Sequence, residues 1–148
     1  MNRFSYIFST FFYTGKFPIA PGTFGSLIAL PFFYLLLGNR LLYFIILAFL
    51  ILLGTITSKI VSESYNVEDP SFIVIDEVAG LGIAMMLAQK NIIYVIVAFV
   101  LFRLFDIFKL PFIKASEHIK NGIGIMLDDI LAGLITFIIM RISLMVFF

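Results

Sequence analysis

The sequence predicts an all-α protein, a compact membrane-embedded bundle of about four to five membrane helices. The 148 residues are 62% hydrophobic and 13% charged, with a mean hydropathy of +1.15. A soluble domain has about 45–50% apolar and about 25% charged residues. The apolar residues form five runs, separated by short segments that are polar or rich in Gly and Pro. Because the length allows one compact unit, residues 1–148 are expected to form a single membrane domain.

Charge and cysteine content exclude several classes of protein. The net charge is +1, so the chain lacks the polybasic surface of a nucleic-acid-binding protein, and no such partner is expected. The absence of cysteine excludes disulfides, thiolate metal sites and cysteine nucleophiles. Membrane lipids are the expected surroundings, and an oligomer is possible but not indicated.

The N-terminal part of the chain is expected to lie at the membrane interface. Residues 1–14 are rich in aromatic side chains and too short to cross a bilayer. Gly15–Ser26 interleaves Gly and Pro with hydroxyl residues, which predicts a shaped loop and not a regular helix. Thr23 or Ser26 is then expected to cap the helix that follows.

The five apolar runs supply the predicted membrane helices. A full span needs roughly 20 residues, so the first run either crosses the membrane or forms a re-entrant hairpin with the second. The polar segment Lys59–Pro70 is expected to be a connecting loop with a helical turn or two. The runs are Ser26–Leu37, Leu41–Thr57, Phe72–Ala88, Ile92–Phe108 and Gly122–Phe148.

Five of the nine acidic residues interrupt these apolar runs, where an unpaired carboxylate is costly. Tracing the crossings brings all of them to one membrane face, because each lies close to a run end on the same side. Carboxylates gathered this closely repel, so either some stay protonated or a divalent cation joins them. Oxygen ligands favour a hard ion, Mg²⁺ first. The predicted metal-binding and catalytic residues are Asp76, Glu77, Asp106, Asp128 and Asp129.

Basic and backbone groups near this cluster could bind a phosphoryl group. Side-chain charge and the N–H groups of the Gly/Pro loop would contact its oxygens. Hydrolysis would use metal-activated water with a carboxylate as the general base; which carboxylate, and whether one or two ions bind, stays open. A purely structural ion pair between Arg103 and Asp106 is the alternative for part of the cluster. The predicted phosphate-binding residues are Lys16, Thr23, Gly25, Ser26, Arg103 and Lys109.

The basic residues also orient the predicted bundle. More of them fall on the face that carries the carboxylates than on the opposite one, and the positive-inside rule places the richer face in the cytoplasm. The two sets are Arg3, Lys16, Lys59, Lys109, Lys114 and Lys120 on the carboxylate face, and Arg40, Lys90 and Arg141 opposite. The single histidine, His118, is expected to be an exposed loop residue.

Four motifs together resemble the phosphatidylglycerophosphatase A family: GKFPIAPGTFGS, IVIDEVAG, FRLFDIFK and NGIGIMLDDILAG, in this order. The resemblance implies an all-helical, Mg²⁺-dependent lipid phosphatase of the bacterial inner membrane that converts phosphatidylglycerophosphate to phosphatidylglycerol. It places the five carboxylates on the family's acidic positions and Lys109 on its basic position. The sequence departs from the family pattern after Lys109, where it reads Leu-Pro-Phe-Ile, and at Asn121, where Gly is common.

Two other functions would also use acidic residues within a membrane protein. A phosphatidyltransferase of the CDP-alcohol type would also use membrane carboxylates and Mg²⁺, but its longer acidic signature is absent. A small cation or proton transporter could use the same acidic cluster. Its polar residues should then continue across the bilayer, whereas Ile83–Leu87 and Ile92–Phe99 are almost wholly apolar.

Overall fold

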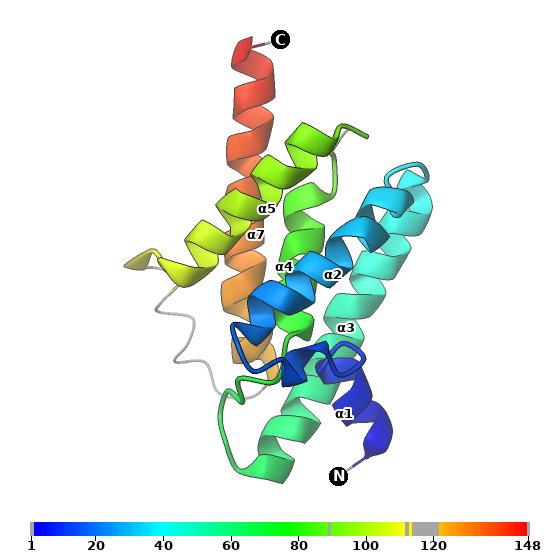
Figure 1. The fold of residues 1–148 in the computed structure, drawn as a ribbon, viewed down its shortest axis with the longest axis vertical. Coiled ribbons are helices and arrows are strands. Elements are labelled where there is room, and N and C mark those ends of the chain that lie inside the picture. The colour runs from blue at the N-terminus through cyan, green and yellow to red at the C-terminus, as the bar shows by residue number, and fades with distance from the viewer. Residues whose placement is uncertain (1, 89, 112, 114–121, 148) are drawn as a thin grey trace.

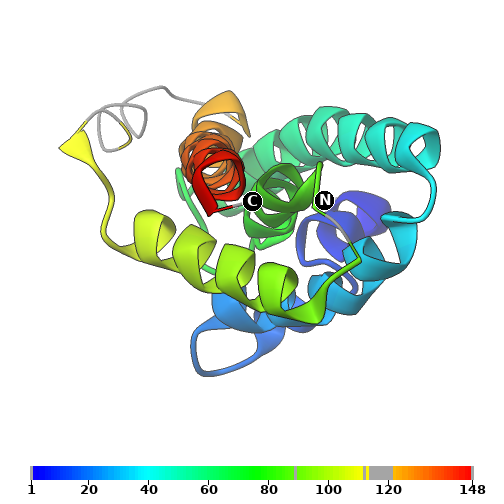
Figure 2. The same ribbon diagram turned by 90° about the horizontal axis from the view of Figure 1, so that it is seen from above.

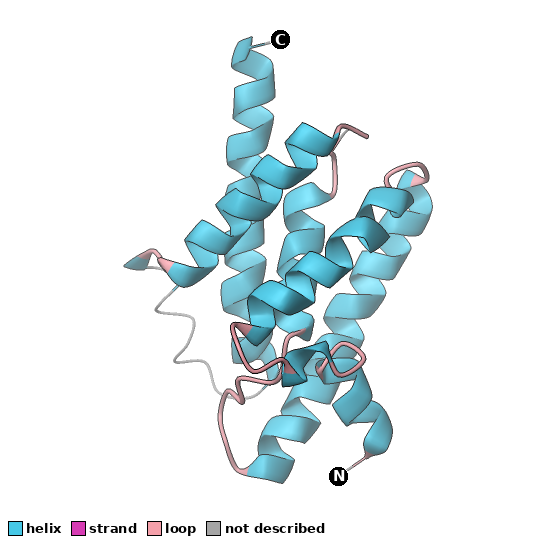
Figure 3. Cartoon of the chain, in the orientation of Figure 1, coloured by secondary structure: helices cyan, strands magenta, loops and turns pink. Residues whose placement is uncertain are grey.

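The computed structural model describes residues 2–88, 90–111, 113 and 122–147. Every regular element in this part of the chain is helical, which confirms the all-α prediction (Figure 3). The chain ends lie at opposite ends of the long axis (Figure 1). In chain order the elements are α1 (Arg3–Ser9), η1 (Thr14–Lys16), α2 (Pro21–Leu36), α3 (Arg40–Tyr65), α4 (Ile75–Met85), α5 (Ile92–Ile107) and α7 (Gly122–Phe147).

Helix α4 forms the centre of the bundle. It contacts α2, α3, α5 and α7, which surround it when the molecule is viewed along its long axis (Figure 2). All its residues are buried except Glu77, which is partly exposed. A helix that is apolar nearly all round is expected to be buried in this way. In the C-terminal half of α4, the carbonyl of Gly82 accepts a 2.6 Å hydrogen bond from the hydroxyl of Tyr43 in α3.

Asparagines set several helix ends between the apolar runs. The side chain of Asn39 accepts a hydrogen bond from the N–H of Leu42 at 3.1 Å and begins α3. Asn91 begins α5 in the same manner, accepting from Ile93 N at 2.9 Å. Each side chain satisfies an N–H that has no partner within its helix. The polar segment after the second run starts as the last turns of α3, as predicted.

The Gly/Pro segment Gly15–Ser26 is a shorter loop than predicted. Helix α2 begins at Pro21, because a proline at the first helical position loses no hydrogen bond there. The residue before the helix is Ala20, whose φ of 47° is left-handed. The prediction that Thr23 or Ser26 caps this helix is therefore wrong. Both lie inside it, and Ser26 Oγ donates 2.8 Å to the carbonyl four residues earlier.

Two helices are long and apolar enough to cross a membrane, Arg40–Tyr65 and Gly122–Met145. Helix α4 has 11 residues, which at about 1.5 Å per residue covers roughly half of a hydrocarbon core about 30 Å thick. Helices α2 and α5 have 16 residues each, still short of a full span. The count of four to five membrane helices therefore stays a prediction, while a membrane-associated helical bundle is supported.

The approach of α7 to α4 depends on two glycines. A Cβ at Gly80 would lie 2.6 Å from the carbonyl oxygen of Asp129 and 2.6 Å from Phe102 Cε2. A Cβ at Gly133 would collide with the carbonyl of Gly80. Small residues let helix backbones pack this closely in membrane proteins. The two backbones are thus in direct contact one turn beyond Asp76 and Asp129.

The structure predicts that Gly133→Ala destabilises the bundle by about 1–3 kcal/mol, the usual cost of overpacking a tight contact. The measurement is the thermal unfolding midpoint of the purified protein in detergent. Gly38→Ala is the matched control, since its Cβ would lie 3.1 Å from the flexible end of Lys90 and at an ordinary contact distance, 3.8 Å, from the carbonyl oxygen of Leu35. An unchanged midpoint for Gly133→Ala would show that the two helices are free to move apart.

Candidate active site

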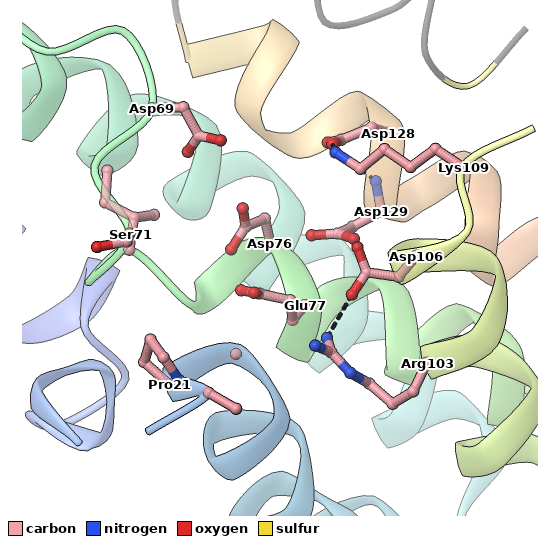
Figure 4. Close-up of a pocket in the computed structure, with 13 residues that line it drawn as sticks. Pro21, Asp69, Ser71, Asp76, Glu77, Arg103, Asp106, Lys109, Asp128 and Asp129 are labelled. Atoms are coloured by element: carbon pink, nitrogen blue, oxygen red, sulfur yellow. Dashed lines mark hydrogen bonds and ion pairs between the residues drawn. The ribbon is translucent and has the colours of Figure 1, made fainter. Parts of the chain in front are cut away.

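One cavity of about 260 Å³ is lined mainly by charged and hydroxyl-bearing residues. Its walls come from the start of α2, the loop before α4, the first turn of α4, the end of α5 and the first half of α7 (Figure 4). Its charged and hydroxyl-bearing lining residues are Asp69, Ser71, Asp76, Glu77, Arg103, Asp106, Lys109, Asp128 and Asp129. The five predicted carboxylates therefore do converge, as the crossings implied.

Three of the carboxylates form a compact group that has no ion pair with any base among the described residues. Oxygens of Asp76, Glu77 and Asp129 lie within 4.8 Å of one another and point toward a common centre (Figure 4). Asp76 is 7% exposed and Asp129 is 3% exposed. One buried oxygen of each carboxylate has no hydrogen-bond partner among the described residues. Such a group is costly unless a cation or a proton compensates its charge.

The other two carboxylates each meet a base. Asp106 forms an ion pair with Arg103, one turn earlier on α5. The Nζ of Lys109 donates to Asp128 Oδ2 at 2.5 Å. The second oxygen of Asp128 accepts from the N–H of Asp129 at 3.1 Å. The five carboxylates are therefore not equivalent, and the two paired ones bring the positive charges to the cavity.

The group of Asp76, Glu77 and Asp129 fits a hard divalent cation. Carboxylate oxygens are the ligands that Mg²⁺ prefers, and Mg²⁺ takes few of them because it keeps waters and substrate oxygens in its remaining positions. The unpartnered oxygens are the atoms that a cation would satisfy. Both acids on α4 also lie in its first turn, where the helix dipole favours negative charge.

The N-terminus of α2 forms another wall of the cavity, through Ala20, Pro21 and Gly22. The first hydrogen bond within this helix joins Phe24 N to Ala20 O, so the N–H groups before Phe24 have no partner in the helix. Gly22 lies against Glu77, and a Cβ there would collide with the carboxylate. Helix N-termini of this kind bind phosphate oxygens.

Four predicted phosphate-binding residues are not among those that line the cavity. Lys16 lies over the rings of Tyr6 and Tyr13. Gly25 packs against Val74. Ser26 is fully buried and bonded within α2, and Thr23 is in the first turn of that helix. The sequence predicts all four in a loop, whereas Thr23, Gly25 and Ser26 lie within α2 and Lys16 is the last residue of η1.

Sequence reasoning placed Asp69 in a connecting loop and did not assign Ser71, although both line the cavity. Their signal in the sequence was weak, a polar stretch around Pro70 just before the α4 acids. The path of the chain between α3 and α4 brings Asp69 and Ser71 to the cavity. The predicted loop residue His118 lies outside the described residues.

Comparison with known proteins assigns the chain to a family. It matches phosphatidylglycerophosphatase A over residues 7–144. A Bacteroides thetaiotaomicron relative, provisionally named a phosphatidylinositol-3-phosphatase, is 37% identical and covers 93% of this chain and 91% of its own. Phosphatidylglycerophosphatase A of Escherichia coli is 37% identical, covering 84% of this chain and 74% of its own.

The Haemophilus influenzae protein named phosphatidylglycerophosphatase A is 35% identical, covering 81% of this chain and 76% of its own. No solved structure matches the chain. The match to the family extends over the five predicted carboxylates and both bases of the cavity. The chain therefore belongs to the phosphatidylglycerophosphatase A family and is a membrane-associated phosphatase, a hydrolase of phosphoric monoesters.

Proposed function

We propose that this phosphatase hydrolyses phosphatidylglycerophosphate to phosphatidylglycerol and inorganic phosphate, with Mg²⁺ as its cofactor. The observation that carries the proposal is the cavity in which three unpaired carboxylates lie beside Arg103 and Lys109. This combination suits a dianionic phosphate monoester, whose charge requires both a metal and basic side chains. The names of the E. coli and H. influenzae relatives supply the lipid.

In this proposal Asp76, Glu77 and Asp129 hold the ion. When bound, it supplies positive charge that activates water and neutralises the phosphoryl oxygens. Asp128 is the next residue to Asp129, so its side chain points about 100° away around the helix. Its pairing with Lys109 makes it the candidate general base or a positioning residue, outside the metal group. Asp106 holds Arg103 in the cavity.

The substrate's phosphoryl oxygens would be bound by Arg103, Lys109 and the first N–H groups of α2. The guanidinium of Arg103 keeps a buried Nε with no hydrogen-bond partner among the described residues. Guanidinium and ammonium groups form the stronger, charge-assisted bonds to phosphate. The first turn of α2 adds uncharged donors. Lys16, Thr23, Gly25 and Ser26 do not line the cavity and would then make no contact with the phosphoryl group.

We also propose a multi-pass location in a bacterial inner membrane, with the cavity facing the cytoplasm. Lys16, Lys59 and Lys109 belong to segments at the end of the bundle that holds the cavity, whereas Arg40 begins α3 at the opposite end and Lys90 lies beside that end (Figure 1). This distribution agrees with the positive-inside rule. It also suits an enzyme whose substrate is a headgroup at the membrane surface.

A second substrate is favoured by the name of the B. thetaiotaomicron relative, which refers to phosphatidylinositol 3-phosphate. That lipid shares the phosphate monoester on a polyol headgroup and differs in the bulk of the polyol. Asp69 and Ser71, which line the cavity from the loop before α4, would contact the polyol hydroxyls in this proposal. The two substrates therefore have to be compared directly.

The substrate prediction is tested by release of inorganic phosphate from a panel of lipid phosphates in detergent micelles. Phosphatidylglycerophosphate should be hydrolysed with the highest kcat/KM, EDTA should stop the reaction, and added Mg²⁺ should restore it. A higher kcat/KM for phosphatidylinositol 3-phosphate would reassign the substrate. Activity that survives EDTA would contradict the metal, and cation flux into liposomes without phosphate release would favour the transporter.

The metal-site prediction is tested with Asp129→Asn, which keeps the size of the side chain and removes its charge. Because loss of a group that merely supports a metal ligand already costs 10–100-fold, we expect kcat/KM to fall by at least about a hundredfold. The Mg²⁺ concentration for half-maximal activity should rise as well. The matched control is Glu63→Gln, which should keep full activity, because this exposed acid lies 3.9 Å from the Nζ of exposed Lys59 and does not line the cavity. Undiminished activity in Asp129→Asn would exclude this residue as a ligand.

A further inference from the structure

An apolar loop leads directly into the wall of the cavity. Residues 17–20 connect η1 to α2, and the last of them, Ala20, lines the cavity together with Pro21. The side chains of Phe17 and Ile19 therefore lie within three residues of the site. They are 43% and 75% exposed. The segment that enters the wall of the polar cavity thus carries exposed apolar side chains.

The backbone of this loop indicates its depth in the membrane. The N–H groups of Ile19 and Ala20 make no hydrogen bond to any described residue. Irregular backbone with unpaired N–H groups is not tolerated where it faces the hydrocarbon of a bilayer. The backbone of the loop is therefore expected where water reaches it, while its exposed apolar side chains favour contact with acyl chains. That place is the boundary between headgroups and hydrocarbon.

The loop is held in one conformation by contacts at both of its ends. The ring of Phe17 stacks on Phe24 of α2 with centroids 3.9 Å apart and planes 9° apart. The N–H of Phe17 bonds to the carbonyl of Thr14 at 3.1 Å. At the other end Ala20 has a left-handed φ of 47°, a conformation that a non-glycine residue keeps only when its surroundings impose it. Ile19, between these fixed ends, is presented outward.

A cation next to the loop adds a charge that anionic lipid would match. The Nζ of Lys16 lies 5.2 Å from the ring centroid of Tyr6 and 4.9 Å from that of Tyr13. Tyrosine and lysine are typical of the interfacial layer, where the ring lies at headgroup level and the ammonium group meets phosphates. The surface next to the cavity thus combines apolar contacts with one positive charge.

We propose that Phe17 and Ile19 form an apolar lip that binds the acyl-glycerol part of the phospholipid substrate while its phosphate monoester enters the carboxylate cavity. Lys16 attracts the anionic lipid surface beside the lip. The inference rests on the proposed function and goes beyond it. It assigns recognition of the lipid body to the loop before α2 and recognition of the phosphate to the cavity.

The test is Ile19→Ser, assayed on phosphatidylglycerophosphate at increasing surface concentration in mixed micelles. Because the side chain is mostly exposed in the free protein, the change removes lipid contact and spares the fold. We expect the KM for lipid to rise about tenfold, the effect of losing one large apolar contact. The kcat should stay within about twofold of the original, because the lip touches no reacting atom. The double variant Phe17→Ser/Ile19→Ser should raise KM further.

The matched control is Leu35→Ser, which removes a side chain of similar size that is 72% exposed on α2, far from the cavity. Its KM should equal that of the unchanged protein. An unchanged KM in Ile19→Ser, or a fall in kcat with KM unaffected, would overturn the lip. Absence of phosphate release by the unchanged protein would instead refute the proposed function, so the two failures are distinct.

Discussion

The direct contact between the backbones of α4 and α7 is the constraint on which the candidate site depends. Each helix carries an aspartate four residues before the glycine of the contact: Asp76 before Gly80, and Asp129 before Gly133. Residues four apart share a helix face. The glycines therefore bring the two carboxylates together one turn away, at the same end of the bundle. A bulkier contact would separate the helices and open the carboxylate group.

The carboxylates of the cavity fall into two groups, those that pair with a base and those that do not. Asp106 and Asp128 each form an ion pair with a base beside the site. Asp76, Glu77 and Asp129 each keep a buried oxygen with no hydrogen-bond partner among the described residues. A bundle stabilised only by ion pairs would leave no such excess of buried negative charge, because its desolvation is costly. The excess is understandable in a protein that meets a cation during its function. It also explains why a short, buried helix begins with two acids.

In the proposed membrane orientation, the short α4 would bring this chemistry near one membrane surface. Helix α4 is short, and it begins at the cavity, where the loop before it and the start of α2 also meet. Phosphate monoesters of lipids lie at that depth, above the hydrocarbon and beside water. With the apolar lip that we propose at Phe17 and Ile19, the same end of the bundle would bind both parts of a phospholipid. The long helices α3 and α7 pack against the short α4 and are long enough to cross a membrane, which α4 is not.

Much of this protein followed from its sequence. Composition and the five apolar runs determined the all-helical class, and the acids within those runs identified five of the six carboxylates that line the cavity. Four motifs were specific enough to indicate the family. These features are local, since each depends on residue type and spacing along one helix.

The tertiary structure decided which acid meets which base: Lys109 and Asp128 are 19 residues apart, and no periodicity relates them. It also decided that α2 begins at Pro21, that Asp69 and Ser71 reach the cavity, and that α4 is too short to span. Those outcomes depend on how helices pack against one another, because packing, and not the propensity of a single segment, determines where side chains from distant parts of the chain meet.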